Sequence, residues 1–115
     1  MAVIKLPALT IPLNTAASNI IGGFLFDNGG KISIMAPATI SGVVKVEVSD
    51  VEPGSAVDAD FRTLQSGGAD VTVTADDATV ITTVAFRSLR LLEDNTSHAA
   101  EVFAVVMQEQ NVEIY

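Results

Sequence analysis

The stretch VVKVEVS, residues 43–49, decides the fold class predicted for this chain. Its valines recur at every second position, and polar residues stand between them. A period of two is typical of a β-strand that buries one face and exposes the other. The stretch therefore predicts a half-buried strand on which Lys45, Glu47 and Ser49 face solvent.

Short segments of the same kind recur along the chain at spacings of about ten residues. Examples are KISIMA (31–36), VTVT (71–74) and SLRLL (88–92). Turn-forming residues separate them, as in DNGG (27–30) and SGGAD (66–70). No segment keeps a helical period over three turns. The pattern predicts an all-β fold, an antiparallel β-sandwich that is jelly-roll-like and has about eight or nine short strands.

Composition excludes several classes of function. The chain has 115 residues, the usual length of one domain, and its formal net charge of -8 repels nucleic acids and anionic lipids. It has no cysteine, so disulfides and thiolate chemistry are absent and a reducing compartment suits it. No apolar run reaches the roughly 20 residues of a membrane span. We expect neither a nucleic-acid partner nor a membrane partner.

The first 13 residues, MAVIKLPALTIPL, are apolar and contain Pro7 and Pro12. Proline interrupts the helix of a signal peptide and removes a hydrogen-bond donor from a strand, which places it at sheet edges. We expect residues 1–13 to form an extended N-terminal arm or edge strand, and residues 14–115 to form a single β-sandwich domain. The arm residues proposed to bind a partner are Val3, Ile4, Leu6, Pro7, Leu9, Ile11 and Pro12.

The residues needed for catalysis are scarce. His98 is the single histidine, and it lies in the loop EDNTSH (93–98), where an ordinary surface residue is expected. One histidine without cysteine does not supply a zinc site of the usual kind. No nucleophile elbow, P-loop or dinucleotide-binding motif occurs. We therefore predict that the protein is not an enzyme and binds no cofactor.

The loop DVEPGSAVDAD, residues 50–60, is rich in acids. Oxygen ligands suit calcium, so this loop supplies weak calcium candidates. They are Asp50, Glu52, Asp58 and Asp60. Their spacing does not match the EF-hand pattern, and a solvated turn whose acids protect strand edges is the favoured interpretation. No metal site is favoured.

The closing segment EVFAVVMQ, residues 101–108, is apolar on both faces. Phe103, Val105 and Met107 share one face of the expected strand. The opposite face carries Val102, Ala104 and Val106. A strand that is apolar on both faces needs a cover on both. Loops of the same chain could supply the second cover, or this face could be a subunit interface, which is the hypothesis that we carry forward.

The order of these segments resembles small virion proteins of tailed bacteriophages. The shared elements, in chain order, are Ile11, Pro12 and Ser18, then KISIMAPA (31–38), GVVKVEVSD (42–50), DFRTL (60–64), FRSLRL (86–91) and VFAVVM (102–107). The loop 50–60 is longer than the tight turn that is typical of the family.

The resemblance implies a head decoration or cement protein that binds and bridges major capsid subunits on the outer capsid surface. It implies a homo-oligomer, a trimer or dimer, on a virion that is assembled in the host cytoplasm. A tail or fibre component is an alternative within the same virion. The chain is also similar to discoidin-type jelly rolls, so a glycan-binding module, with or without calcium, is the other alternative.

Overall fold

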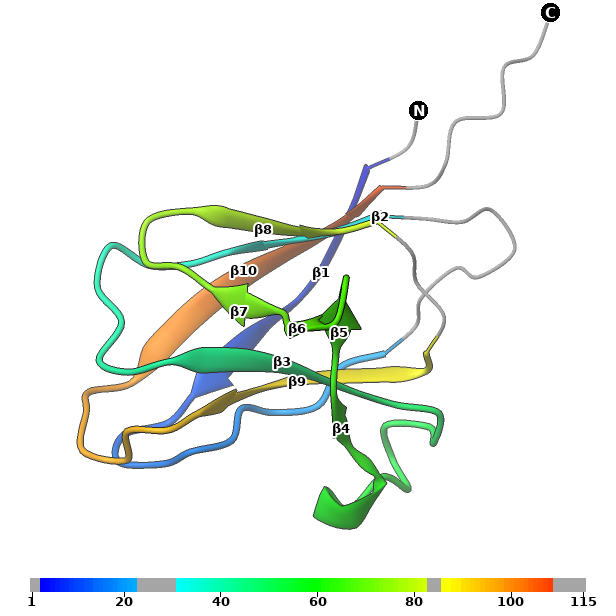
Figure 1. The fold of residues 1–115 in the computed structure, drawn as a ribbon, viewed down its shortest axis with the longest axis horizontal. Coiled ribbons are helices and arrows are strands. Elements are labelled where there is room, and N and C mark those ends of the chain that lie inside the picture. Colours follow the sequence, from blue (N-terminus) through cyan, green and yellow to red (C-terminus); the bar gives the residue numbers. More distant parts are fainter. Residues whose placement is uncertain (1–2, 23–30, 83–85, 109–115) are drawn as a thin grey trace, which may run out of the picture.

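The computed structural model describes residues 3–22, 31–82 and 86–108. It confirms the all-β prediction, because two antiparallel sheets of four strands each lie face to face (Figure 1). Strands β1 to β10 include several of only two residues, so the described strands outnumber the eight or nine expected from the sequence. The DNGG turn (27–30) lies outside the described residues. No helix among the described residues is long and apolar enough to cross a membrane.

The first sheet has the strand order β1-β10-β2-β8. Every neighbouring pair in it is antiparallel, and β1 forms one edge. The strand bounds are β1 Val3–Ile11, β10 Glu101–Gln108, β2 Lys31–Met35 and β8 Ala78–Ile81. The sheet therefore pairs the first and last strands of the fold, which are the segments furthest apart in the chain.

The second sheet is built on β3, the strand predicted from VVKVEVS. It pairs with β9 along its whole length, and with β4 and β7 at its two ends. The strand bounds are β3 Val44–Ser49, β9 Ser88–Glu93, β4 Arg62–Thr63 and β7 Thr72–Val73. A short 3-10 helix, η1 (Asp58–Asp60), lies in the loop that follows β3.

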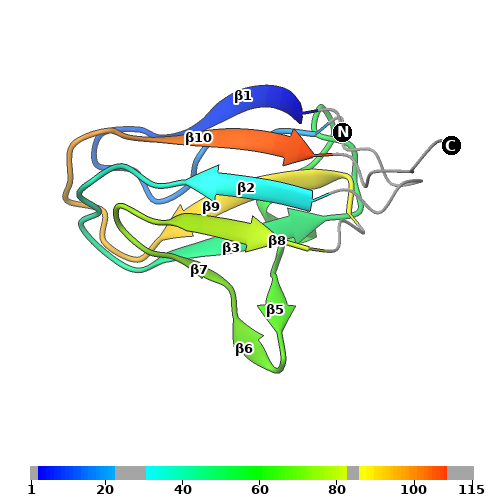
Figure 2. The same ribbon diagram turned by 90° about the horizontal axis from the view of Figure 1, so that it is seen from above.

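A small hairpin projects from the body of the sandwich (Figure 2). Its strands are β5 (Gln65–Ser66) and β6 (Ala69–Asp70). The loop between them is Gly67–Gly68, and both glycines have positive φ, at 61° and 84°. Positive φ at both central residues is typical of a type I′ turn, whose twist matches that of the two hairpin strands. Glycine is favoured there because it adopts positive φ without a steric cost.

The core lies between the two sheets and consists of aliphatic and aromatic side chains. Leu9, Ile34, Leu91 and Phe103 are all fully buried. Each large apolar side chain that is buried in this way stabilises the fold by roughly 1.5–3 kcal/mol relative to exposure. Alternation in β10 places Phe103, Val105 and Met107 in this core, as the sequence pattern predicts.

The edge strand β1 contains a bulge and is protected along its free edge. Its register against β10 shifts between Leu6 and Leu9, where Pro7 offers no N–H to the ladder. The Asn19 amide lies beside this segment: its Oδ1 accepts the Thr10 N–H (2.7 Å), and its Nδ2 donates to the Ala8 carbonyl (3.1 Å). These bonds occupy backbone groups that would otherwise be open to another strand.

Of the two forms expected for residues 1–13, an arm or an edge strand, the structure has the edge strand, and its pairing limits which of these residues a partner could contact. Leu6, Leu9 and Ile11 are buried in the core, so they are not available to a partner while β1 is paired. The cause is the pairing of β1 with β10, which turns alternate side chains toward the second sheet. Pro7 and Pro12 are exposed. The side chains of the remaining arm residues, Val3 and Ile4, lie outside the described set.

The polar face of β3 is also different from the expectation. Glu47 and Ser49 are buried, although their alternation with valine predicts exposure. The loop after β3 folds back over this face, and the buried Phe61 follows η1 there. Arg90 of β9, opposite Glu47 in the register, is buried by the same cover. The second sheet therefore has a polar layer beneath its own loop.

Candidate functional site

The outer face of the first sheet is an apolar surface that no described segment covers. Val102 is 55% exposed, Ala104 is exposed and Val106 is half-buried, so the face expected to form an interface is open. The neighbouring strands add Met35, which is 43% exposed, and Val80, which is 52% exposed. We call this surface, made of Met35, Ala78, Val80, Val102, Ala104 and Val106, the outer apolar face.

Register places these side chains in rows across the sheet. Val106 is opposite both Lys5 of β1 and Ser33 of β2, and Ser33 is opposite Val80 of β8. Ala104 is opposite Met35, which is opposite Ala78. Lys5 and Lys31 are exposed at outward positions of β1 and β2. The outward side chains described on these strands include no acid, although the formal net charge of the protein is -8.

The acids of the loop 50–60 form ion pairs and do not converge on one point. Asp50 and Glu52 lie 3.8 Å from the Arg87 guanidinium, in exposed pairs. Oδ2 of Asp60 accepts the Val57 N–H. Within the described part of the chain, the acids of this loop make no group of three or more that could hold a metal ion. The loop is a turn that closes over the sheet, and its calcium candidates are not brought together.

Asp58 belongs to a different arrangement, centred on Arg90. The Arg90 guanidinium donates from Nε to Glu47 Oε1 (2.8 Å) and from Nη1 to Asp58 Oδ1 (2.6 Å). It also lies over the Phe61 ring, 4.3 Å from the centroid. These contacts fasten η1 to the second sheet, so Arg90 has a structural role.

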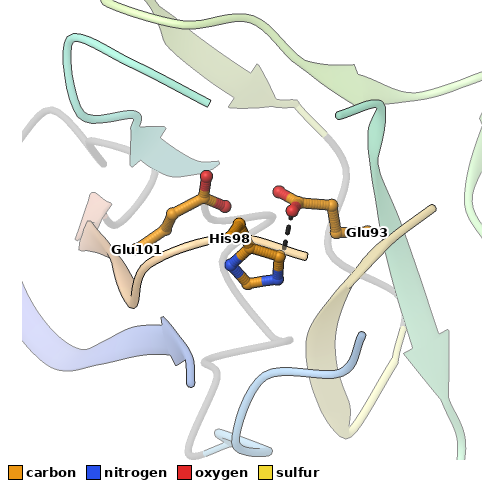
Figure 3. Close-up of side chains that lie close together, drawn as sticks. All are labelled: Glu93, His98 and Glu101. Atoms are coloured by element: carbon orange, nitrogen blue, oxygen red, sulfur yellow. Dashed lines mark ion pairs between the residues drawn. The ribbon is translucent and has the colours of Figure 1, made fainter. Parts of the chain in front are cut away.

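A second polar cluster lies where β9 ends and β10 begins (Figure 3). Glu93 is the last residue of β9, Glu101 is the first of β10, and His98 lies in the loop between them. All three are buried, and the side chains of Glu93 and His98 are fully inaccessible to solvent. This corrects the expectation that His98 is an ordinary surface residue.

Both ring nitrogens of His98 face backbone carbonyl oxygens. Nδ1 lies 2.6 Å from the Ala99 carbonyl oxygen, and Nε2 lies 2.7 Å from that of Thr15. A carbonyl oxygen only accepts hydrogen bonds, so this geometry is the one expected of a ring that is protonated at both nitrogens. The hydrogen bond to Ala99 raises the pKa of His98, with further contributions from Thr15 and Glu93 against the opposing effect of burial.

Three of the four carboxyl oxygens of Glu93 and Glu101 lack donors. Neither oxygen of Glu93 accepts a hydrogen bond in the described structure, nor does Oε1 of Glu101. Oε1 of Glu93 lies 3.2 Å from His98 Nε2 as an ion pair, and Oε2 of Glu101 accepts the Ser41 N–H (2.9 Å). Burial, followed by the proximity of Glu101, raises the pKa of Glu93 to about 7.

The ligand atoms of Glu93, His98 and Glu101 lie within 4.8 Å of one another, a spacing that a metal ion could bridge. However, a metal ligand needs a free lone pair on the imidazole, and both ring nitrogens are committed as donors. The cluster is also closed to solvent, which leaves no approach for a substrate. Its arrangement fits an internal ionic network better than a catalytic or metal centre.

A pocket lies elsewhere on the molecule. It lies at the base of the projecting hairpin, and its lining is Leu64, Gln65, Ser66, Val71, Ile81 and Thr82. None of these side chains titrates.

Comparison of the chain with models of protein families, with curated proteins and with solved structures found no match.

Proposed function

We propose that this protein is a non-enzymatic structural protein of a tailed-phage virion, a head decoration protein that docks on the major capsid protein through the outer apolar face. The observation that carries the proposal is the exposure of Val80 and Val102, at 52% and 55%, on the outer face of one sheet, where β2 with its exposed Met35 lies between their strands. Contiguous apolar side chains on a stable sheet are typical of an interaction surface. The resemblance of segment order to phage virion proteins supports the choice of partner.

The size of the face suits a repeated contact. Burying one exposed valine is worth roughly 1.5 kcal/mol, so one copy binds weakly through a few such side chains. On a capsid the same contact recurs at every equivalent position. A bridge between neighbouring capsid subunits then adds a second contact at a high effective concentration. Weak individual contacts are therefore sufficient for full decoration.

Charge favours a different protein over a second copy as the occupant. Lys5 and Lys31 border the outer apolar face, and the same face of a second copy offers them no described acid as a partner. A capsid surface with acidic side chains around an apolar patch complements the lysines. The acidic remainder of the protein would then face outward and keep decorated particles apart.

The test uses capsids of the virus that carries the gene, prepared without this protein. We expect the wild type to co-sediment with them, and Val102→Asp and Val80→Asp to reduce binding at least tenfold. Val57→Asp is the matched control, because Val57 is 62% exposed but lies beside η1, away from this face. Binding of all variants at the wild-type level, or no binding of the wild type, would refute the proposal.

Light scattering of the free protein provides the second measurement. A dimer or trimer that Val102→Asp dissociates would assign the outer apolar face to self-association, as the sequence-based hypothesis of a subunit interface has it. That result would overturn docking to the capsid through this face.

A further inference from the structure

Three separate loops, 12–18, 37–43 and 94–100, meet at one end of the sandwich (Figure 1). Hydrogen bonds of His98 and Glu101 connect them. The first is the turn 12–18. Nε2 of the His98 ring hydrogen-bonds to the Thr15 carbonyl, and the His98 backbone N–H donates to Asn14 Oδ1. The second is the turn 37–43, whose Ser41 N–H donates a hydrogen bond to Oε2 of Glu101. The third is the loop 94–100, which carries His98 itself. The cluster is thus the point at which these loops are fastened together.

The protons of the cluster follow from its hydrogen bonds. The His98 ring needs both protons, because it faces two acceptors, and it therefore carries a positive charge. The carboxyl groups of Glu93 and Glu101 lie close to one another and would carry two negative charges if both ionised. Buried charge without compensation is strongly unfavourable. One proton held by the carboxyl pair makes the cluster neutral.

The same proton explains the carboxyl oxygens that lack donors. The His98 ring offers its Nε2 proton toward Glu93 Oε1 at 3.2 Å, in addition to the Thr15 carbonyl. A proton between the two carboxyl groups supplies the donor that the other orphaned oxygens, on Glu93 and Glu101, need. Two carboxyl groups that share one proton are a known arrangement where like charges are held together.

We propose that Glu93, His98 and Glu101 form a buried proton-binding site, which holds an imidazolium and one carboxyl proton at neutral pH and thereby fastens the three loops at this end of the sandwich. If the His98 ring loses a proton, a nitrogen lone pair faces a carbonyl oxygen. If the carboxyl pair loses its proton, a second negative charge lies in the interior. The folded protein is then less stable and its loops are less firmly held at alkaline pH. This inference does not depend on the proposed docking to a capsid.

Within the cluster the charge of His98 lowers the pKa of Glu93, whereas the acids around it raise that pKa. Asp94 follows Glu93 and is the other acid near the cluster; its Oδ1 accepts the Val43 N–H. Residues 12–18 and 37–43, which pack on the site from the other loops, contain no ionisable side chain. The surrounding acids therefore favour proton retention, and no nearby base among these segments opposes it.

The sign of the pH dependence follows from the raised pKa values. Glu93 has a pKa of about 7 in the folded protein against an ordinary value of 4.5, so the folded state holds more protons between these values. Stability then falls as pH rises from about 4.5 to about 7. The stabilising contribution of His98 is complete below 6.5 and is lost as pH rises through its raised folded pKa.

The direct test is NMR of the ring nitrogens, which is unambiguous because His98 is the single histidine of the chain. We expect both nitrogens to be protonated at about pH 7, with a titration midpoint above that of a free histidine. Ring shifts of a neutral tautomer at that pH would overturn the proposal. This measurement needs no variant.

Thermal melts of the whole chain test the carboxyl proton. We expect the wild-type Tm to fall by about 5 °C between about pH 5.5 and about pH 8.5. Glu101→Gln supplies a neutral group in place of the shared proton, so its Tm should fall clearly less, and Glu93→Gln should behave alike. Asp77→Asn, which removes an exposed acid of another loop, should keep the wild-type dependence.

Equal pH dependence in the wild type and in both glutamine variants would overturn the inference. Calcium and zinc chloride, added separately at the alkaline pH, complete the experiment. We expect no stabilisation that depends on the cluster. A rise in Tm with either metal that Glu101→Gln abolishes would show that the carboxyl pair holds a metal ion in place of a proton, and would also overturn the inference.

Discussion

Nε of Arg90 lies 2.8 Å from Oε1 of Glu47, and both side chains are buried on the loop-covered face of the second sheet. The two residues are directly opposite in the pairing of β3 with β9. Asp58 adds a second carboxylate from η1, with its Oδ1 2.6 Å from Arg90 Nη1. One guanidinium therefore joins two strands to the loop that covers them.

Removing the buried charge of Arg90 should be among the most destabilising single substitutions in this protein. Arg90→Met keeps the apolar stem but leaves the Glu47 carboxylate buried without a partner, which costs about 3–5 kcal/mol. Urea denaturation measures the loss. Arg87→Met is the control, because the pairs of Arg87 are exposed and 3.8 Å long, and it should change stability by at most about 1 kcal/mol. Equal effects of the two variants would contradict the structural role of Arg90.

The two faces of β10 should respond differently to truncation. Phe103 is fully buried, so Phe103→Ala should lower the free energy of unfolding by about 3–5 kcal/mol. Val102 is its chain neighbour on the outer apolar face, and Val102→Ala should change that free energy by less than about 0.5 kcal/mol in the free protein. Chemical denaturation at one pH gives both numbers. A large loss from Val102→Ala would mean that the outer face is covered in solution.

The Asn19 side chain should contribute to the free energy of unfolding about as much as two ordinary hydrogen bonds, both made to the edge strand β1. Asn19→Ala removes the acceptor for Thr10 N–H and the donor to Ala8, at a cost of roughly 1–3 kcal/mol. Asn19→Asp keeps the acceptor and loses only the donor, so its effect should be intermediate. Hydrogen exchange at the Thr10 amide reports the change locally. Unaltered protection of that amide in Asn19→Ala would refute the assignment.

Unfolding near neutral pH should release protons. The folded pKa of Glu93 is raised to about 7 and that of His98 is also raised, so the unfolded chain holds fewer protons there. Calorimetry at about pH 6.5 in phosphate and in Tris should give unfolding enthalpies that differ by the ionisation heats of the buffers for about one proton. Unfolding of the Glu101→Gln variant should release fewer protons. Enthalpies independent of buffer would contradict the prediction.

The local sequence pattern was sufficient to predict the strands, but it could not predict the loop that covers the outer face of the second sheet. Alternation predicts β3, and Val44 and Val46 are buried as the pattern requires. The same alternation predicts that Glu47 faces solvent. It cannot predict the cover over Glu47, because the loop after Ser49 contacts Arg90, which is far away in the chain. Hydrophobic period reports the core side of a strand and is silent about a polar layer on the other side.

The proton-binding cluster was beyond sequence reasoning for a similar reason. A lone histidine in a polar loop is ordinarily exposed, and His98 is buried because the loop crosses between the ends of β9 and β10 and meets the turn that contains Thr15. The one available signal was the pair of glutamates at the borders of the flanking strands. Prolines likewise marked residues 1–13 as an edge element, but only the pairing with β10 places Leu9 in the core.

The hairpin β5–β6 gives the molecule a natural insertion point. Residues 65–70 are exposed, and nothing lies within 4 Å of where a Cβ would stand on Gly67 or Gly68. An epitope tag or a short affinity peptide spliced between these glycines would stand clear of the sandwich. It would allow the molecule to be labelled, and its copies to be counted on any particle that carries it, without disturbing either sheet.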